Sequence, residues 1–505
     1  MALAGATGAG ALAIALAFAG AVQAQPVVPI PSVAVPPPPP FVGAAATPNP
    51  VRGIPITPRN PFMAPNGESE IHDDGWQTDV TTWGAPLGRS PKTISSQVLR
   101  DCGSITFDRQ GRVVSVCVGV SGPQLYMFDP NTLATLATYS LPPRQSVPTN
   151  TFQDFTGGGY FYLDNQDRVV TSTTTKHILV IAETPGSPGF SLVHDYDLTS
   201  VVSSAEKITS ALPDSHGLLW FVTKTDGVVG TLNLATGAIH AIHLGSGSNG
   251  EIENSFATDQ NGGVYIDTNR KLYRFGAGPG GVPRIVWQIT YPNSGESKPG
   301  QVDDGTGTTP TVMPGGYVNI TDNADPMDIM VYRTAAHPFK WVRRHGRRRR
   351  AALPRQVCRF PIFNKGSSAD ENSIIAAGRS MIAEDNYGYT GPTSVESKTT
   401  TPGLVRVDLN SNGRGCHRIW TSTAVATPTV VSKLALATGL VYTYTVDSSN
   451  DWYWAAVDFR TGKVLYKSYA GTGIGYNNNY AGVSISPSGA EYLGSLGGIL
   501  SLRDG

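Results

Sequence analysis

The chain has 505 residues, enough for one large domain or two to three ordinary ones, and its 38 basic residues equal its 38 acidic ones. Seven of the basic residues are crowded into residues 340–350, and without them the remaining 31 face 38 acids, a net charge of −7. This balance argues against a nucleic-acid partner, because nucleic-acid binders usually spread their basic surface over a whole face.

The first 24 residues, MALAGATGAGALAIALAFAGAVQA, are small and apolar. Their apolar core has the length of a signal-peptide core, and Val22-Gln23-Ala24 offers small residues for cleavage. The alternative is a membrane anchor, but the apolar core is short and interrupted by glycine. We therefore expect a signal peptide at residues 1–24, no transmembrane span in the mature chain, and a secreted, periplasmic or cell-envelope protein.

Residues 25–60 are rich in proline, with the run PPPPP at their centre. Such a composition favours an extended, semi-rigid linker over a packed core. The folded domain is then expected to occupy residues 61–505.

Four cysteines are present, and in an exported chain an even number suggests two disulfides with three possible connectivities. Cys102 and Cys117 flank the turn signal DRQG, and a turn centred between Arg109 and Gln110 places them opposite each other. A bulged turn would shift this register by one residue. If these two pair, Cys358 and Cys416 pair by default.

Short strands with alternating apolar residues recur along the chain, each pair joined by a polar turn. The unit is read in SITFDRQGRVVSVCVG, YFYLDNQDRVVTSTTT, SALPDSHGLLWFVTK, SFATDQNGGVYIDTN, TPTVMPGGYVNITDN, SIIAAGRSMIAEDN, KLALATGLVYTYTV and VSISPSGAEYLGSLGG. Several copies continue into a second hairpin, as in LYMFDPNTLATLATYSL and WAAVDFRTGKVLYKSYAG. Two hairpins per repeat make a four-stranded antiparallel sheet, and such repeats are typical of the blades of a β-propeller.

The eight copies predict an all-β fold, a propeller of eight four-stranded blades, or seven if one copy is degenerate. A pair of β-sandwiches or a β-helix explains paired hairpins at this period less well. The last copy, ending at GGILSLRDG, is one strand short. We expect the segment KTISSQVL, which precedes the first copy, to supply that strand and close the ring, since closure removes exposed sheet edges.

The repeat AAVDFRTGKVLYKS resembles those of quinoprotein-type propellers, and NSFATDQNGGVYI is similar to the repeats of gluconolactonase-like, NHL and YVTN blades. The resemblance covers most of residues 100–505 and is one of scaffold. Because one scaffold hosts many functions, it leaves the activity open. The resemblance to gluconolactonase-like enzymes implies a divalent metal in the channel. The resemblance to quinoproteins implies PQQ, although this chain lacks the adjacent cysteines and the recurring tryptophan of that family.

Polar residues follow several strands at comparable points of the repeats. They occur in ITDNADP, IAEDNYGY, GEIENSF and GYNNNYAG. Carboxylate and amide oxygens suit a hard cation such as Ca²⁺, although Asn and Asp beside Gly are also ordinary turn formers. The candidate metal ligands are Asp322, Asn323, Glu384, Asn386 and Asn254.

No motif identifies a catalytic residue, so the favoured function is binding of a small molecule or an envelope protein on the propeller face or in its channel. The alternatives are a metal-dependent, lactonase-like hydrolase and, with less support, a PQQ-type oxidoreductase. No cofactor other than a divalent metal such as Ca²⁺ is expected.

The run FKWVRRHGRRRRAALPRQ stands between two strands of a repeat, DIMVYR and QVCRFPIF. It has no alternating apolar pattern, which favours a solvated loop on the propeller rim. Two other interpretations remain. One is contact with a polyanion or an anionic surface. The other is a sequencing or frameshift artefact, in which a locally shifted reading frame produces the arginine codons.

Overall fold

The computed structural model describes residues 37–144, 153–154, 156–344, 347–392 and 399–505. The chain separates into two units, Met1–Pro38 and Pro39–Gly505, and all the elements described here belong to the second. The signal peptide predicted for residues 1–24 lies outside the described residues. Within the described ranges, no helix combines the length and the apolar character needed to cross a membrane.

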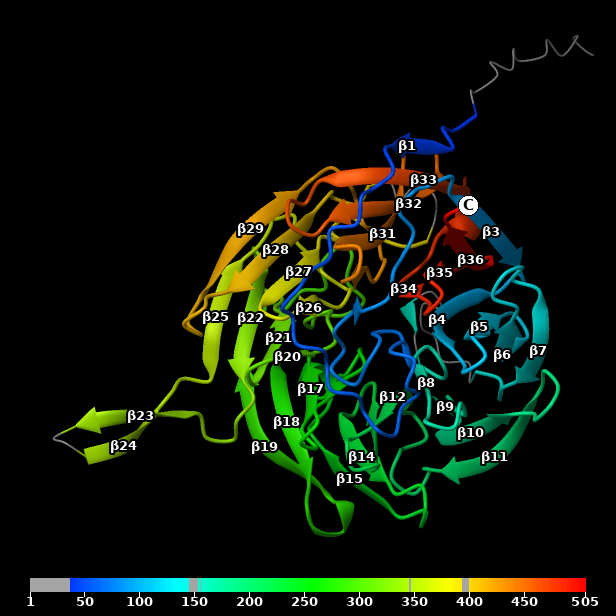
Figure 1. Cartoon of the computed structure of the whole chain (residues 1–505). Coiled ribbons are helices and arrows are strands. Elements are labelled where there is room, and N and C mark those ends of the chain that lie inside the picture. Colours follow the sequence, from blue (N-terminus) through cyan, green and yellow to red (C-terminus); the bar gives the residue numbers. More distant parts are fainter. Residues whose placement is uncertain (1–36, 145–152, 155, 345–346, 393–398) are drawn as a thin grey trace, which may run out of the picture. The chain divides into compact units, whose positions relative to one another are not determined.

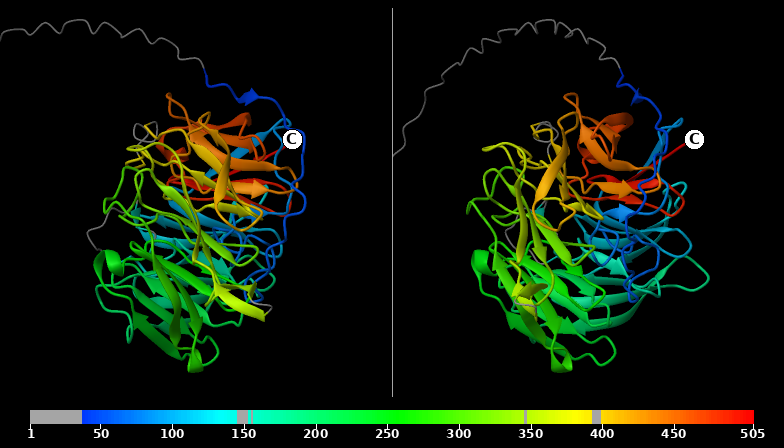
Figure 2. Two further views of the ribbon diagram at one scale, coloured as in Figure 1. Left: turned by 90° about the vertical axis from the view of Figure 1, so that its left-hand side faces the viewer. Right: turned by 60° about the vertical axis from the view of Figure 1, so that its left-hand side comes forward.

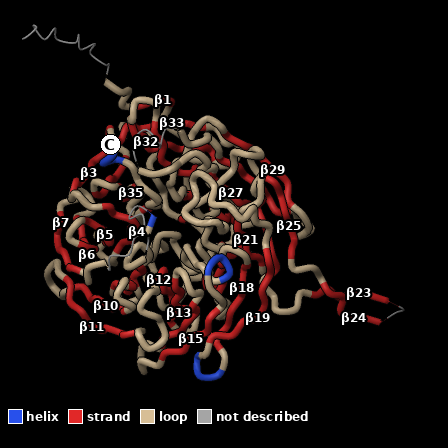
Figure 3. Tube along the Cα trace, turned by 180° about the vertical axis from the view of Figure 1, so that it is seen from behind, coloured by secondary structure: helices blue, strands red, loops and turns tan. Residues whose placement is uncertain are grey.

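Eight four-stranded antiparallel blades form a ring, so the protein is a β-propeller (Figure 1). The predicted fold class and the count of eight blades are confirmed, and the seven-bladed, sandwich and β-helix alternatives are excluded. Strands and loops account for nearly all of the ring (Figure 3). The described helices are single 3-10 turns: η2 (Gly247–Asn249), η3 (Pro279–Gly281) and η4 (Ile474–Tyr476).

The first four blades take their strands in chain order, from the channel outward. The first has β4 (Asp101–Phe107), β5 (Val113–Gly119), β6 (Gly122–Phe128) and β7 (Thr135–Ser140). The second has β8 (Phe161–Leu163), β9 (Val169–Ser172), β10 (His177–Glu183) and β11 (Phe190–Asp197). The third has β12 (Ile208–Pro213), β13 (Leu219–Thr223), β14 (Val228–Leu232) and β15 (Ile239–His243). The fourth has β16 (Ala257–Thr258), β17 (Val264–Thr268), β18 (Lys271–Ala277) and β19 (Pro283–Thr290).

The remaining blades include an insertion and strands from the N-terminal part of the chain. The fifth has β20 (Thr311–Met313), β21 (Tyr317–Thr321), β22 (Asp328–Arg333) and β25 (Gln356–Pro361). The sixth has β26 (Ile375–Ala377), β27 (Ser380–Glu384), β28 (Leu404–Leu409) and β29 (Cys416–Ser422). The seventh has β30 (Lys433–Ala435), β31 (Leu440–Val446), β32 (Asp451–Asp458) and β33 (Val464–Thr472), with β1 (Phe41–Gly43) and β2 (Val80–Thr81) at its two edges. The eighth has β34 (Val483–Ile485), β35 (Glu491–Ser495), β36 (Gly498–Arg503) and β3 (Lys92–Gln97).

An aspartate forms the turn between the first two strands of each of the first four blades. In the first blade, Asp108 Oδ1 accepts hydrogen bonds from the backbone N–H groups of Gln110 (2.9 Å) and Arg112 (2.8 Å). The same two bonds recur at Asp164, Asp214 and Asp259. Three residues after each aspartate the backbone has positive φ, at Gly111, Asp167, Gly217 and Gly262. The local chemistry of Asp and Gly therefore produces the repeated hairpin.

The ring is closed by the strand that the sequence predicted. β3 pairs antiparallel with β36, from Lys92 opposite Arg503 to Gln97 opposite Gly498. The outermost strand of the eighth blade thus comes from the N-terminal part of the chain, and the other three come from its end.

Both predicted disulfide pairs are confirmed. Cys102 and Cys117 are direct partners in β4 and β5, with Cα atoms 4.0 Å apart. Nearer the turn the register is shifted by one residue, and an irregularity between Cys102 and Ile105 restores the alignment of the cysteines. The second bridge joins Cys358 in β25 to Cys416 in β29, so it ties together the outer strands of the fifth and sixth blades.

Part of the segment for which a linker was predicted contacts the seventh blade. β1 pairs with β33, and the ring of Phe41 stacks on that of Tyr466 with 5.6 Å between centroids. Further along, the N–H of Val51 donates to the carbonyl of Leu436 (2.9 Å). In Figure 2 this part of the chain, drawn in blue, runs along one face of the ring.

Residues 64–81, here called the plug, run along the inner strands of the blades. Backbone carbonyls of the plug accept hydrogen bonds from innermost strands of four successive blades. These bonds are Thr258 to Gly75, Val312 to Trp76, Ala376 to Thr78 and Leu434 to Asp79. Glu68 accepts hydrogen bonds from Thr106 of the first blade and Ile485 of the eighth. Ser69 accepts one from Leu163 of the second blade. The plug therefore joins seven of the eight blades at the channel.

The arginine-rich run, predicted to be a solvated loop on the propeller rim, forms a β-hairpin there. β23 (Phe339–Arg344) pairs antiparallel with β24 (Arg347–Ala352) over six residue pairs. The hairpin lies between β22 and β25 in the chain and projects from the outer edge of the fifth blade (Figure 1). Alternation of apolar residues did not reveal these strands because they pack on no core.

Candidate ligand site in the central channel

A cavity of about 610 Å³ lies in the channel beside the plug. Its walls come mainly from residues at, or just before, the innermost strands of seven blades. Ile71 and His72 of the plug also line it. The volume lies within the range of cavities that hold small-molecule ligands, roughly 300–1,000 Å³.

One wall of the cavity carries a set of charged and amide side chains. Asn479 Nδ2 donates to Asp101 Oδ2 (3.2 Å), and Asp154 forms an ion pair with Lys207 (2.6 Å). Burial raises the pKa of Asp101 to about 6. Burial would also raise the pKa of Asp154, but the hydrogen bonds from Lys207 and Thr156 hold it at about 2. One carboxylate of this wall is therefore fixed as an anion, whereas the other titrates near neutral pH.

Another wall is built around Asn254 and Glu371. The hydroxyl of Tyr160 donates to Asn254 Oδ1 (3.4 Å). Glu371 Oε2 accepts from the N–H of Val302 (3.0 Å), and burial together with the nearby Asp303 raises its pKa well above the ordinary value. Valine side chains from two blades supply apolar surface: Val116 and Val118 from the first, and Val431 from the seventh. The cavity thus offers apolar contact and several directional polar groups.

The plug is held against the seventh blade by a fully buried lysine. Lys433 Nζ binds the carboxylate of Asp73, lies 3.2 Å from Asp79 Oδ1 and donates to the carbonyl of Ile71 (2.6 Å). His72 Nδ1 lies 3.2 Å from Asp79 Oδ1. Burial alone would lower the pKa of Lys433, and the surrounding carboxylates raise it above its ordinary value. The cavity residues Ile71 and His72 are thereby held in place.

Two buried glutamates should make the protein less stable as the pH rises from about 4.5 to 7. Burial raises the pKa of Glu68 and of Glu384 from 4.5 to about 7 in each case. In this window the folded protein retains protons that the unfolded chain has released, so the free energy of unfolding falls with increasing pH. The contribution of each group is fully present below pH 4.5 and is lost above its folded pKa.

Urea unfolding at a series of pH values checks this expectation. Glu68→Gln should reduce the fall in unfolding free energy between pH 4.5 and 7 by about 1–3 kcal/mol. The exposed Glu296 provides a control, and Glu296→Gln should keep the wild-type slope. Equal slopes in wild type and Glu68→Gln would contradict the assignment.

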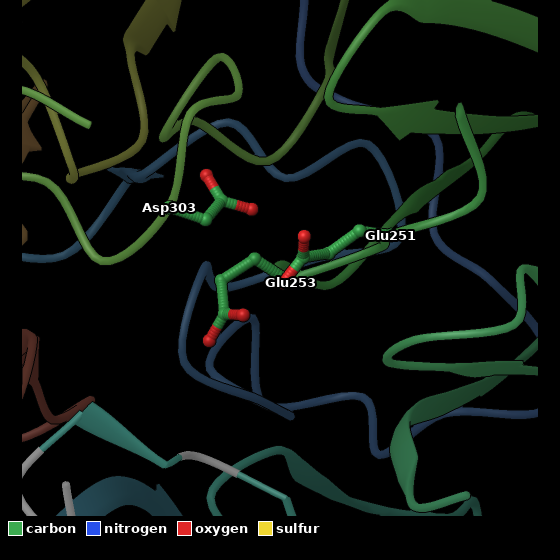
Figure 4. Close-up of side chains that lie close together, drawn as sticks. All are labelled: Glu251, Glu253 and Asp303. Carbon is green, nitrogen blue, oxygen red and sulfur yellow. The ribbon is translucent and has the colours of Figure 1, made fainter. Parts of the chain in front are cut away.

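Three carboxylates lie close together beside the cavity. Glu251, Glu253 and Asp303 each place an oxygen within 4.8 Å of the other two (Figure 4). Glu253 also binds the ammonium of Lys224, and Glu251 accepts from Asn269 Nδ2 (3.2 Å). Asp303 Oδ1 accepts from the N–H of Gly305 (2.8 Å), whereas its buried Oδ2 has no partner among the described residues. Burial and the charge of Glu253 raise the pKa of Asp303 to about 8.

The candidate ligands named from the sequence are all buried, and most of their bonds link turns and blades. Asp322 Oδ1 accepts from the N–H groups of Ala324 and Asp328 within one turn. Asn323 donates to the carbonyls of Glu296 and Asp304 (both 2.9 Å). These two residues therefore brace the loop beside the fifth blade.

The other three candidates lie nearer the channel. Glu384 accepts from the N–H of Ser432 (3.2 Å) and from Asn372 Nδ2 (3.3 Å), so it links the sixth and seventh blades. Asn386 donates to the carbonyl of Thr427 (2.8 Å). Of the five candidates, Asn254 is the one that lines the cavity.

Part of the acidic cluster is visible in the sequence. Glu251 and Glu253 stand in the polar stretch GEIENSF, but Asp303 was missed. Its signal is the pair of aspartates before glycine in QVDDG, some fifty residues further along the chain. Only the ring brings that loop beside the fourth blade.

Comparison with known proteins leaves the activity open. No family model matches the chain. An uncharacterized protein from Archaeoglobus fulgidus is 26% identical over 320 residues, which are 60% of this chain and 62% of that protein. The chain therefore spans less than two thirds of the length of this relative.

Among solved structures the chain is similar to several propellers at low identity. A streptogramin B lyase is 10% identical with a TM-score of 0.41, over 82% of this chain and 97% of that one. A catalytically inactive virginiamycin B lyase from Staphylococcus aureus, with quinupristin, is 11% identical with a TM-score of 0.39, over 75% and 98% of the two chains.

Proposed function

We propose that this protein is an exported propeller that binds a small molecule in its channel cavity. The observation that carries the proposal is the cavity of about 610 Å³, whose lining comes from seven blades and combines apolar surface with polar side chains. Cavities of this size and lining are the usual sites of small-molecule binding. An envelope protein docking on the propeller face is the alternative partner.

Export is supported by the sequence and by the bridges. The first 24 residues have the composition of a signal peptide. All four cysteines are paired in two disulfides, which form and persist in oxidising compartments. We therefore place the protein in the periplasm, at the cell envelope or outside the cell. We also propose that the repeats are related to quinoprotein-like, NHL, YVTN and gluconolactonase-like blades, which they resemble in sequence.

Filling the cavity tests the proposal. Gly103 lines the cavity, and a Cβ built on it meets no other atom closer than 4.0 Å, so Gly103→Leu should fold with less free volume. The control is Gly84→Leu, at an exposed position with open space around its Cβ. Compounds from a thermal-shift screen of metabolites should bind the wild type and Gly84→Leu, and Gly103→Leu should lose at least about tenfold in affinity. Equal binding to all three would reject the cavity as the site.

A second candidate function is metal-dependent hydrolysis, and the acidic cluster favours it. Three carboxylates face one ammonium, Lys224, and Asp303 Oδ2 is buried without a described partner. Oxygen donors of this kind fit a hard divalent cation such as Ca²⁺. A cation held by Glu251, Glu253 and Asp303 would polarise a carbonyl group, as in lactone hydrolysis.

Calcium titration separates this candidate from simple ligand binding. Ca²⁺ should raise the melting temperatures of the wild type and of Asp304→Asn. It should leave the melting temperature of Asp303→Asn unchanged. Asp304 is a matched control because it neighbours the cluster but pairs with Arg270 (2.6 Å). If titration calorimetry with Ca²⁺ gave no heat and a chelator left the melting temperature of the wild type unchanged, the metal site would be ruled out. The cavity proposal would still stand.

A further inference from the structure

The hairpin β23–β24 is a separate two-stranded sheet that extends from the propeller. Its strands pair only with each other, and Figure 1 shows it directed away from the ring. The N–H of Leu353 donates to the carbonyl of Pro338 (2.9 Å), which closes the base of the hairpin. Substitutions in this arm should therefore leave the blades intact.

Arg355 anchors the base of the hairpin to the body of the propeller. Its guanidinium donates to the carbonyls of Arg333 (2.6 Å) and Ala336 (2.9 Å). It also lies 4.3 Å from the ring centre of Trp287 in the neighbouring blade. The hairpin is thus presented on a fixed support.

One face of the hairpin combines aromatic rings with arginines. Alternation along β23 puts Phe339, Trp341 and Arg343 on the same face, and their register partners include Arg350 and Arg348. The guanidinium of Arg350 lies 4.4 Å from the ring centre of Phe339 and 5.5 Å from that of Trp341. Both rings stay in contact with solvent, with 40% of Phe339 and 57% of Trp341 exposed.

The positive charge of this arm is not compensated within the described part of the chain. None of the ion pairs found there involves Lys340, Arg343 or residues 348–350. The sequence contains no acidic residue between Asp328 and Asp370. Arg343 and Arg348 are direct cross-strand partners, and like charges in that position are destabilising. A negatively charged partner would relieve this repulsion.

We propose that the hairpin is a membrane-contact arm that binds the anionic headgroups of a lipid surface. Lys340, Arg343 and the arginines at 348–350 bind headgroup phosphates. Trp341 and Phe339 enter the interfacial layer, where aromatic rings are favoured. Arginines alone would fit any polyanion, and the exposed aromatic rings among them favour lipid. Outside the run the chain carries a net charge of −7, so an anionic surface attracts the arm while repelling the remainder. This contact is independent of what the channel binds.

Vesicle flotation of the full chain tests the proposal. The wild type should bind phosphatidylglycerol vesicles at low salt, release them at high salt and ignore phosphatidylcholine vesicles. The triple variant Arg348→Gln/Arg349→Gln/Arg350→Gln should bind at least about tenfold more weakly. The control variant Arg52→Gln/Arg59→Gln/Arg284→Gln removes the same charge from exposed sites elsewhere and should bind like the wild type.

Tryptophan emission distinguishes lipid from a soluble polyanion. Vesicle binding should shift the emission of the wild type to shorter wavelength, and Trp341→Ser should lose both the shift and part of the affinity. Equal binding by the two triple variants would overturn the proposal. So would binding to heparin or DNA that vesicles do not displace and that Trp341→Ser leaves unchanged. A peptide map lacking the arginines of residues 347–350 would also overturn it.

Discussion

Replacing Lys433 with methionine should lower the free energy of unfolding by about 3–5 kcal/mol, because it leaves buried carboxylates without their counter-ion. Asp73, Asp79 and Lys433 are each fully shielded from solvent, and the ammonium contacts both carboxylates and the carbonyl of Ile71. Methionine matches the length of the side chain but neutralises nothing. The urea midpoint, followed by circular dichroism, measures the loss.

Two further variants show whether charge is the cause. Adding Asp73→Asn and Asp79→Asn to Lys433→Met should recover part of the loss, because the carboxylates are then neutral. Both aspartates have positive φ, a conformation that asparagine tolerates. Lys463 is exposed, and Lys463→Met should change the unfolding free energy by less than about 0.5 kcal/mol. A Lys433→Met protein as stable as Lys463→Met would contradict the role of the ion cluster.

Replacing Trp76 with alanine should cost about 3–5 kcal/mol, the usual range for a large aromatic side chain removed from a core. Trp76 is 7% exposed and packs in the cluster that contains Tyr265, Trp287 and Val312. Its backbone carbonyl accepts a hydrogen bond from the N–H of Val312. Because its neighbours in the cluster come from the fourth and fifth blades, the side chain fills space between the plug and these two blades. Thermal and urea unfolding should both show the loss.

Trp341→Ala is the matched control for this substitution. Trp341 has 57% of its surface exposed on the projecting hairpin and touches no blade core. Its removal should leave the unfolding free energy within about 0.5 kcal/mol of the wild type. If Trp76→Ala proved equally mild, the plug would be a loosely bound appendage, and its assignment as part of the core would be wrong.

The repeated blades could be predicted because their determinants are local. Asp108 and its counterparts at positions 164, 214 and 259 bind backbone groups two and four residues ahead, so four residues of sequence specify each turn. The closing strand was predictable for a different reason. A count of strands left the last blade one short, and KTISSQVL was the segment available to complete it.

The plug and the acidic cluster were not predictable because their determinants are distant in sequence. The plug stretch GESEIHDDGWQTD shows no alternation, and its charges suggest solvent exposure. These side chains are nevertheless mostly buried, and Lys433, which pairs with Asp73, is 360 residues away in the sequence. Asp303 likewise lies about fifty residues from Glu251 and Glu253 in the sequence, and the folded ring brings the three carboxylates together. Asp322 and Asn323 matched a metal-ligand pattern. In the structure Asp322 accepts hydrogen bonds within its own turn, and Asn323 donates to the carbonyl of Glu296 in another loop.

The closing strand has a consequence for the order in which the chain becomes a folded molecule. β3 precedes the first strand of the first blade, yet its partner β36 is the last of the described strands. The plug contacts both early and late blades, so neither β3 nor the plug can reach its final place until the eighth blade has been synthesised. Long-range pairing of this kind delays folding, since loop closure must come before its contacts form. A chain exported in an extended state would thus keep its ring open during passage and lock it on arrival.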